Sequence, residues 1–122
     1  MIADDDQASL DTLAGILEGA GHRVVRATDG QQALQEALVR KVDLIVLDVS
    51  MPQLGGVQAC HCLKAMPKTS KIPVILTAAK KDPAAKTLAE HMQGSVKILR
   101  KPVDPDELLE CASRFLRPKS LI

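Results

Sequence analysis

The chain has 122 residues, of which 46% are hydrophobic and 25% charged, and its formal net charge at pH 7 is +1. This balance predicts one folded domain with an aliphatic core, and it argues against a disordered chain, an acidic tail or a nucleic-acid binder. Phe115 is the only Phe, Tyr or Trp residue, so binding of nucleic acid by base stacking is not expected.

In the first half of the chain, apolar runs of strand length alternate with segments of helical period. The opening "MIA" (1–3) predicts a very short first strand, and the helix that follows it ends at the "GAG" of 19–21. Val- and Ile-rich runs predict further strands over 22–27 and 42–48. Two helical stripes are expected in this half, and they consist of Leu10, Leu13, Ile16 and Leu17 and of Ala33, Leu34, Ala37 and Leu38.

The second half continues the alternation, with strands predicted over 72–78 and 96–101 and a weak helix over about 82–93. A capping box is expected at the last helix, with Asp104 as N-cap, Pro105 at the first helical position and Glu107 at the third. The helical stripes in this half are Val57, Cys60, Leu63 and Lys64; Ala85, Leu88, Ala89 and Met92; and Leu108, Leu109, Ala112, Phe115 and Leu116. The alternation predicts an α/β fold, a doubly wound parallel sheet in a single domain over 1–122.

Polar side chains stand at the carboxyl ends of the predicted strands. They are Asp4, Asp5, Asp6, Asp48, Thr77 and Lys101. In a doubly wound sheet these ends form the binding crevice, so the side chains should meet at one edge. Carboxylates so close together would take up protons unless a cation lay between them, and Mg²⁺ prefers oxygen ligands. A carboxylate beside Mg²⁺, a lysine and a threonine can accept a phosphoryl group, which makes Asp48 the candidate nucleophile.

Four segments, taken in order, resemble the receiver domain of two-component response regulators. They are "DDD" after the first strand, "LDVSMP" after the third, "ILTA" on the fourth and "KP" after the fifth. The resemblance covers the whole chain and implies a flavodoxin-like fold, with five parallel strands in the order 2-1-3-4-5 flanked by five helices. It implies a signalling domain and no enzyme: a histidine kinase or phosphotransfer protein supplies the phosphoryl group, and a conformational change relays the signal.

The resemblance also implies roles for the acidic residues. Asp48 would be the phosphoacceptor. Asp5 and Asp48 would bind Mg²⁺ directly, Asp4 would bind it through water, and the backbone carbonyl of Ser50 would be a further ligand. Asp6 would lie outside this group, as a solvated or capping carboxylate near the first helix.

The remaining site residues of the family match less completely. Thr77 would hydrogen-bond the phosphoryl oxygen, Lys101 would pair with the phosphoryl group, and the Lys101–Pro102 bond is expected to be cis. The family usually has Tyr or Phe three residues before this lysine, where Ile98 stands here. The switch position therefore lacks a ring, and Ile98 has no hydroxyl to gain or lose a hydrogen bond.

Two smaller departures concern the backbone. The turn after Asp48 usually reads Pro-x-x-Asp-Gly, whereas Gly55 replaces the Asp here. The resemblance places the first strand in the middle of the sheet, where unpaired backbone is costly. Because "MIA" is so short, we expect either that its start is trimmed or that Met1 replaces native residues.

Two alternatives come from other classes of protein. A degenerate receiver that docks to partners without phosphorylation would suit Ile98 and the weak helix over 82–93, but it has no need of Asp48, Thr77 and Lys101 together. An aspartate-nucleophile phosphohydrolase would need a second Asp two residues after the first, where Ser50 stands, and a cap domain for which the chain has no room.

The remaining features predict a cytoplasmic domain that binds neither membranes nor nucleic acid directly. Three cysteines without a framework spacing suit a reducing compartment, and the "CHC" of 60–62 does not suit a metal site because its cysteines would point in different directions on a helix. No signal peptide is expected, and the apolar run 44–47 is too short to cross a membrane. A downstream protein would bind the face of the fourth helix, fifth strand and fifth helix.

Overall fold

The computed structural model describes residues 1–51, 54–79 and 96–116. Its elements in chain order are β1 (Ile2–Ala3), α1 (Gln7–Gly19), β2 (Arg26–Ala27), α2 (Gly30–Val39), β3 (Ile45–Asp48), α3 (Gly56–Ala65), β4 (Val74–Ala78), β5 (Val96–Arg100) and α5 (Pro105–Phe115). The helix predicted over 82–93 lies outside the described residues. Every other predicted element is present, so the described part of the chain holds four of the five expected helices.

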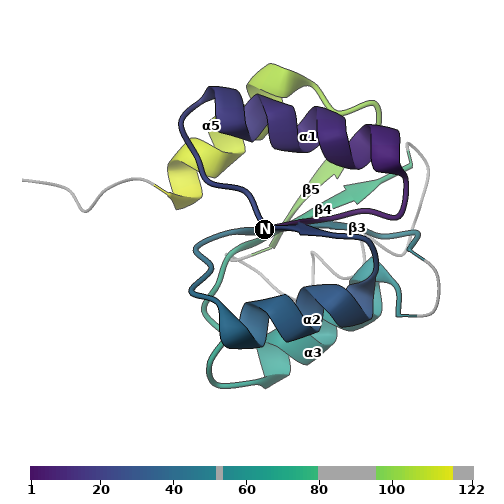
Figure 1. The fold of residues 1–122 in the computed structure, drawn as a ribbon, viewed down its shortest axis with the longest axis vertical. Helices are drawn as coiled ribbons and strands as arrows, with labels where there is room; N and C mark the ends of the chain where they lie inside the picture. Colours follow the sequence, from purple (N-terminus) through teal and green to yellow (C-terminus); the bar gives the residue numbers. More distant parts are fainter. Residues whose placement is uncertain (52–53, 80–95, 117–122) are drawn as a thin grey trace, which may run out of the picture.

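The strands form one five-stranded sheet in the order β2-β1-β3-β4-β5, and each pair of neighbours is parallel. Helices α1 and α5 cover one face of the sheet, and α2 and α3 cover the other (Figure 1). This is the predicted doubly wound, flavodoxin-like architecture with the predicted strand order. It brings the carboxyl ends of all five strands to the same edge of the sheet.

Strands β2 and β3 are shorter than the predicted ranges of 22–27 and 42–48. Both neighbour β1, which offers only Ile2 and Ala3 as partners in the ladder. The preceding residues of both segments have no strand opposite them, so their apolar sequence alone does not make them strands. A strand needs a partner as well as a suitable pattern of side chains.

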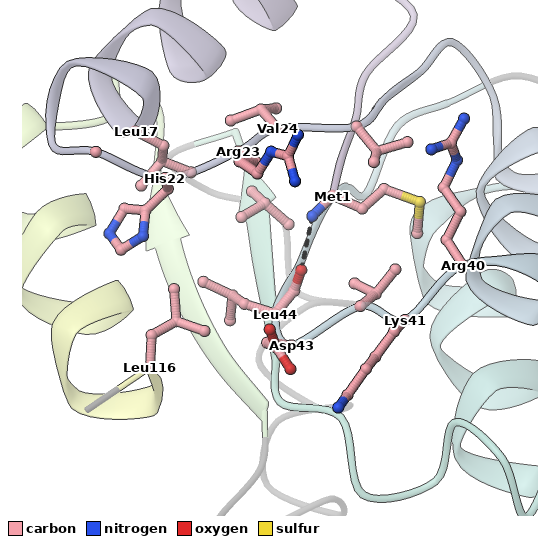
Figure 2. A pocket seen from close by; sticks show the side chains of 14 residues that line it. Met1, Leu17, His22, Arg23, Val24, Arg40, Lys41, Asp43, Leu44 and Leu116 are labelled. Carbon is pink, nitrogen blue, oxygen red and sulfur yellow. Dashed lines mark hydrogen bonds between the residues drawn. The ribbon is translucent and has the colours of Figure 1, made fainter. Parts of the chain in front are cut away.

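Met1 lines a cavity at the amino ends of the strands. The ammonium group of Met1 donates a hydrogen bond to the carbonyl oxygen of Leu44 at 2.8 Å (Figure 2). Burial lowers the pKa of this ammonium to about 6, and the charge of Asp43 opposes that shift. A cavity of about 790 Å³ surrounds Met1 and lies at the end of the sheet away from the predicted carboxylate site.

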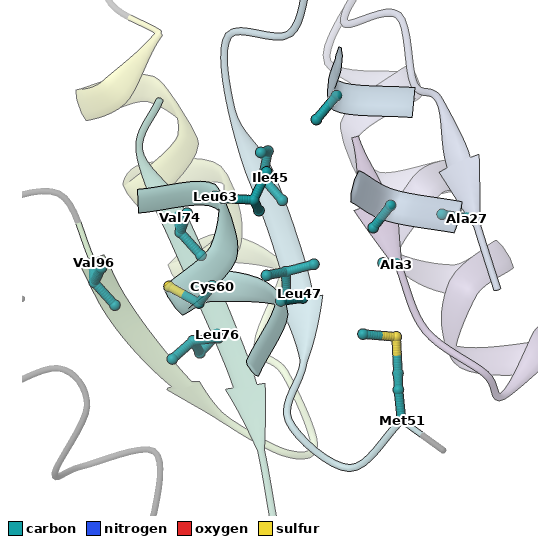
Figure 3. Packing of buried hydrophobic residues seen from close by; sticks show 13 residues of the cluster. Ala3, Ala27, Ile45, Leu47, Met51, Cys60, Leu63, Val74, Leu76 and Val96 are labelled. Atoms are coloured by element: carbon teal, nitrogen blue, oxygen red, sulfur yellow. The ribbon is translucent and has the colours of Figure 1, made fainter. Parts of the chain in front are cut away.

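The core is aliphatic, as the composition predicts, and it has two halves. On the α2/α3 face, Leu47, Leu63 and Leu76 belong to a buried cluster that also includes the side chain of Met51 (Figure 3). On the α1/α5 face, a second cluster contains the buried residues of both helices, with the single ring of Phe115 only half-buried at its margin. Burial of aliphatic side chains on both faces fixes the strands and therefore the edge where they end.

The start of α5 differs in detail from the predicted capping box. Asp104 is the N-cap of α5, but its carboxylate accepts a hydrogen bond from the Asp106 amide at 2.9 Å rather than sharing a reciprocal capping box with Glu107. Proline at the first helical position leaves the next amide as an available donor.

Within the described residues, no helix combines the length and the apolar character that crossing a membrane requires.

Candidate functional site

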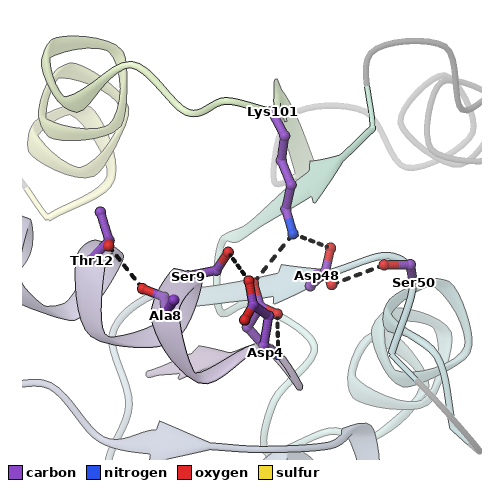
Figure 4. A network of polar contacts seen from close by, with 8 residues as sticks. Asp4, Ala8, Ser9, Thr12, Asp48, Ser50 and Lys101 are labelled. Carbon is purple, nitrogen blue, oxygen red and sulfur yellow. Dashed lines mark hydrogen bonds and ion pairs between the residues drawn. The ribbon is translucent and has the colours of Figure 1, made fainter.

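The carboxyl edge of the sheet brings the predicted side chains together. Asp48 ends β3 and lies beside Thr77 in the parallel register of β3 and β4. Asp4 follows β1, the other neighbour of β3, and Lys101 follows β5. Figure 4 shows the side chain of Lys101 reaching across this edge toward both carboxylates. Four elements therefore contribute to one polar cluster.

The ammonium group of Lys101 bridges two buried carboxylates. Its Nζ atom lies 3.1 Å from Oδ1 of Asp48 and 3.4 Å from Oδ2 of Asp4. The carboxylate side chains are 4% and 0% exposed, whereas the lysine is 30% exposed. Buried carboxylates are costly unless a cation or hydrogen-bond donors face them, so this lysine stabilises the arrangement.

Burial and the neighbouring charges shift the pKa values of Asp4 and Lys101. Burial raises the pKa of Asp4 above its ordinary value, and the nearby charge of Asp48 raises it further, against the opposing effects of the Asp6 amide and Lys101. For Lys101, burial alone would lower the pKa, but the hydrogen bond and charge of Asp48, with those of Asp4, raise it overall. The lysine is therefore held as a cation, while one carboxylate retains its proton more readily than usual.

Hydrogen bonds orient both buried carboxylates. The Asp6 amide donates to Oδ1 of Asp4 at 2.9 Å, and the Ser50 hydroxyl donates to Oδ2 of Asp48 at 3.0 Å. The sequence assigned a role only to the backbone carbonyl of Ser50, so the contact of its hydroxyl is an addition. A serine two residues after an aspartate in a turn is a local signal that could have indicated this bond. The result is that both oxygens of Asp48 face a donor.

Thr77 is placed differently from the other polar groups. Its side chain is fully buried, and its hydroxyl has no hydrogen-bond partner in the part of the chain that the structure describes. A buried hydroxyl without a partner costs free energy, so such groups in folded proteins need an explanation. At the carboxyl end of β4, beside Asp48, this hydroxyl is a donor available to a ligand at the edge.

The same edge offers a set of metal-binding oxygens. One carboxylate oxygen from each of Asp4, Asp5 and Asp48 lies within 4.8 Å of the others. Two of these residues are buried and Asp5 is exposed, so a cation here would have both protein oxygens and access to water. The donor set consists of oxygen atoms alone, which fits Mg²⁺. As predicted, Asp6 stands apart: it is the N-cap of α1 and accepts a hydrogen bond from the Ser9 hydroxyl.

The outlying candidates also have defined places. Ile98 is half-buried on β5 and packs against the cluster on the α2/α3 face. The Lys101–Pro102 bond is cis, as expected. Cys60 is buried and Cys62 is exposed, and neither forms a disulfide, so the two cysteines of "CHC" point in different directions as predicted.

Comparison with known proteins matches these features to one family. A sequence model described as the response regulator receiver domain matches residues 1–113. The chain is 34% identical over 116 residues to Protein PilH of Pseudomonas aeruginosa, and the match covers 95% of each chain. It is 32% identical over 117 residues to the alkaline phosphatase synthesis transcriptional regulatory protein PhoP of Bacillus subtilis, and it spans 48% of that protein.

Solved structures agree with the sequence comparison. The receiver domain of NtrX from Brucella abortus is similar with a TM-score of 0.86 at 26% identity, and the match covers 97% of this chain and 98% of that one. The chemotaxis protein CheY4 of Vibrio cholerae has a TM-score of 0.84 at 26% identity, with 93% and 94% of the two chains covered.

Proposed function

The chain belongs to the family of response regulator receiver domains, and we propose that Asp48 is the residue in it that accepts a phosphoryl group. The donor would be the phosphohistidine of a histidine kinase or of a phosphotransfer protein. One observation carries the proposal: Lys101 bridges the buried carboxylates of Asp4 and Asp48 beside the Thr77 hydroxyl, which has no hydrogen-bond partner among the described residues. A purely structural ion pair would explain the lysine but not the unpaired hydroxyl.

In the proposed reaction, a carboxylate oxygen of Asp48 attacks the phosphorus atom. A P–O bond forms to the carboxylate, and the P–N bond to the donor histidine breaks, with its electron pair returning to the imidazole. Lys101 already lies 3.1 Å from Asp48 and would turn its ammonium toward the incoming phosphoryl oxygens. The Thr77 hydroxyl would donate to one of these oxygens and so gain the partner that it lacks.

Asp5 and Asp48 would hold Mg²⁺ directly, the Ser50 carbonyl would be a further ligand, and Asp4 would act through water. When bound, the ion supplies positive charge that screens the approach of the anionic phosphoryl group to the carboxylates. The raised pKa of Asp4 fits a cluster that is short of positive charge, since Lys101 alone faces both buried carboxylates in the described residues.

The proposed activity is limited to self-catalysed phosphotransfer to Asp48 and self-catalysed dephosphorylation of that residue. Output would pass to a downstream protein through the face that includes β5 and α5, while the predicted fourth helix of that face lies outside the described residues. None of the three cysteines, all of which lie in the described residues, forms a disulfide, which supports a reducing compartment, so we place the domain in the cytoplasm. The alternative of phosphorylation-independent docking is less well supported, because it leaves the constellation around Asp48 without a purpose.

The proposal is tested by incubating the protein with Mg²⁺ and acetyl phosphate and measuring its intact mass. The wild type should gain one phosphoryl group, and Asp48→Asn should gain none. Asp6→Asn is the matched control, because it removes an aspartate from the same acidic run but outside the cluster, and it should be phosphorylated normally. A wild type that gains no mass, or a gain that persists in Asp48→Asn, would overturn the assignment.

A further inference from the structure

Two glycines hold helix starts in very close contact with the segment that carries Asp48. A Cβ atom built on Gly30, the first residue of α2, would lie 2.1 Å from the carbonyl oxygen of Leu54. A Cβ atom built on Gly56, the first residue of α3, would lie 2.3 Å from the carbonyl oxygen of Asp48 itself. Both distances fall far below any tolerable contact, and in both cases the opposing atom belongs to the backbone.

The two contacts are linked through the start of α3. Leu54 immediately precedes Gly55 and Gly56, and the Gly56 amide donates to the carbonyl of Val49 at 3.3 Å. If a side chain on α2 displaced Leu54, Gly55 and Gly56 would move with it. Gly56 lies against the carbonyl of Asp48, so the displacement would reach the peptide that joins Asp48 to Val49. Helices α2 and α3 lie on the same face of the sheet (Figure 1), and the first residue of α2 approaches Leu54 just before α3 begins.

We infer that Gly30 is a positioning residue for the phosphoacceptor: its missing side chain lets α2 seat the start of α3 against the backbone of Asp48. The effect of Gly30 on phosphorylation rests on the proposed function, whereas its effect on the position of the Asp48 backbone rests on the contacts alone. The three heavy atoms nearest to a Cβ built on Gly30 all belong to Leu54, so its effect on the site would pass through Leu54 and the glycines that follow.

Backbone freedom does not explain a glycine at this position. Among the described glycines only Gly21 has a positive φ, so alanine could adopt the backbone conformation of Gly30 without strain. Alanine also favours a helix over glycine. If the close approach to Leu54 did not matter, Gly30→Ala would stabilise the protein and leave the site unchanged.

The expected effect follows from the size of the displacement. To restore an ordinary contact, the Leu54 carbonyl would have to retreat from 2.1 Å by more than about 1 Å. A misplacement of about 1 Å at a reacting group can slow a reaction by about 100-fold when it is fully transmitted. Because the shift passes through two glycines, we expect Gly30→Ala to lower Mg²⁺ affinity and the rate of phosphorylation by about tenfold.

The experiment compares the wild type with Gly30→Ala and with the matched control Gly15→Ala, whose added Cβ would meet nothing within 4 Å on α1. Mg²⁺ affinity is measured by calorimetry and phosphorylation by intact mass with acetyl phosphate, at a temperature where circular dichroism shows each variant folded. We also expect altered amide exchange at Asp48 and Val49 in Gly30→Ala. Gly15→Ala should match the wild type in all three measurements.

Wild-type Mg²⁺ affinity, rate and amide exchange in Gly30→Ala would overturn the inference, whatever its melting temperature. If Gly30→Ala does not fold, Gly55→Ala provides the test, because its Cβ would approach the Val49 carbonyl only to 3.2 Å. That variant should show a smaller reduction of about two- to fivefold, and an unchanged site in it would overturn the inference. A wild type that gains no phosphoryl group would refute the proposed function alone, since amide exchange still tests the positioning.

Discussion

Replacing Thr77 by valine should raise the stability of the protein while weakening its proposed activity. Valine has nearly the same shape as threonine but carries a methyl group in place of the hydroxyl. The Thr77 side chain is 0% exposed, and its hydroxyl has no hydrogen-bond partner among the described residues. The substitution therefore removes a buried polar group that contributes nothing to the unphosphorylated fold, and it leaves no other group unpaired.

The magnitude follows from the cost of an unpaired buried hydroxyl, which is about 1–3 kcal/mol. We expect Thr77→Val to increase the free energy of unfolding by about 1 kcal/mol, or the Tm by roughly 3–5 °C for a domain of this size. In the phosphorylated state the same hydroxyl would donate to a charged oxygen, a bond worth about 1.5–3 kcal/mol. Phosphorylation should therefore be weaker in the variant by about 10- to 100-fold.

Stability is measured by urea unfolding with far-UV circular dichroism, because the chain has no Trp or Tyr to report by fluorescence. Phosphorylation is measured by intact mass with acetyl phosphate and Mg²⁺. Thr69→Val is the matched control: Thr69 is also 0% exposed, but its hydroxyl donates to the Leu63 carbonyl at 2.6 Å. The same chemical change there should lower the free energy of unfolding by about 1–2 kcal/mol.

The two substitutions should thus move stability in opposite directions. If Thr77→Val destabilises the protein as much as Thr69→Val does, the hydroxyl of Thr77 has a partner in solution, and the argument from its unpaired state fails. If Thr77→Val is more stable but is phosphorylated like the wild type, the hydroxyl is unpaired yet plays no part in holding the phosphoryl group.

Three further predictions follow from the described contacts. Lys101→Met leaves the two buried carboxylates without their cation, so the free energy of unfolding at pH 7 should fall by about 1–3 kcal/mol. Burial already raises the pKa of Asp4, and it rises further without the opposing charge of Lys101, so the loss should shrink as the pH falls toward 4. An equal loss at pH 7 and pH 4 in urea titrations would contradict this. Burial raises the pKa of Cys60 to about 11, so iodoacetamide at pH 8 should modify Cys62 first in the native protein and Cys60 only after unfolding, as read by mass spectrometry. Lys64 donates to two backbone carbonyls between α3 and β4, so Lys64→Met should lower the free energy of unfolding by about 1–2 kcal/mol, while an unchanged urea midpoint would show that these bonds contribute nothing.

The sequence pattern predicted the order and type of the elements because buried parallel strands and amphipathic helices have distinct periods. It overestimated β2, because residues 22–25, which include Val24 and Val25, look like the start of a strand but have no partner in the ladder. Strand pairing depends on what lies opposite in space, and the pattern of one segment does not contain that information.

The site was predictable to the level of residue types. Polar residues at four strand ends had to meet once the sheet was parallel, and Lys101 does reach both Asp4 and Asp48. The unpaired state of Thr77 and the close approach of Gly30 to Leu54 were not predictable, because each depends on distances of a few tenths of an ångström between separate elements. Packing sets such distances, and many sequences share the same pattern with different packing.

If Ile98 occupies the switch position, as proposed, its side chain would limit the kind of signal that the domain could send. It lies opposite Leu76 in the ladder of β4 and β5, one residue before the pairing of Thr77 with Leu99. A movement of Thr77 toward a phosphoryl group would therefore disturb the strand pair to which Ile98 belongs. Because Ile98 is half-buried against the apolar cluster and carries no polar group, it could respond only by repacking, without making or breaking a hydrogen bond. Phosphorylation of Asp48 would then change only the shape of an apolar surface near Ile98. A partner that recognises this state would do so by apolar packing and without a hydrogen bond to a hydroxyl at this position.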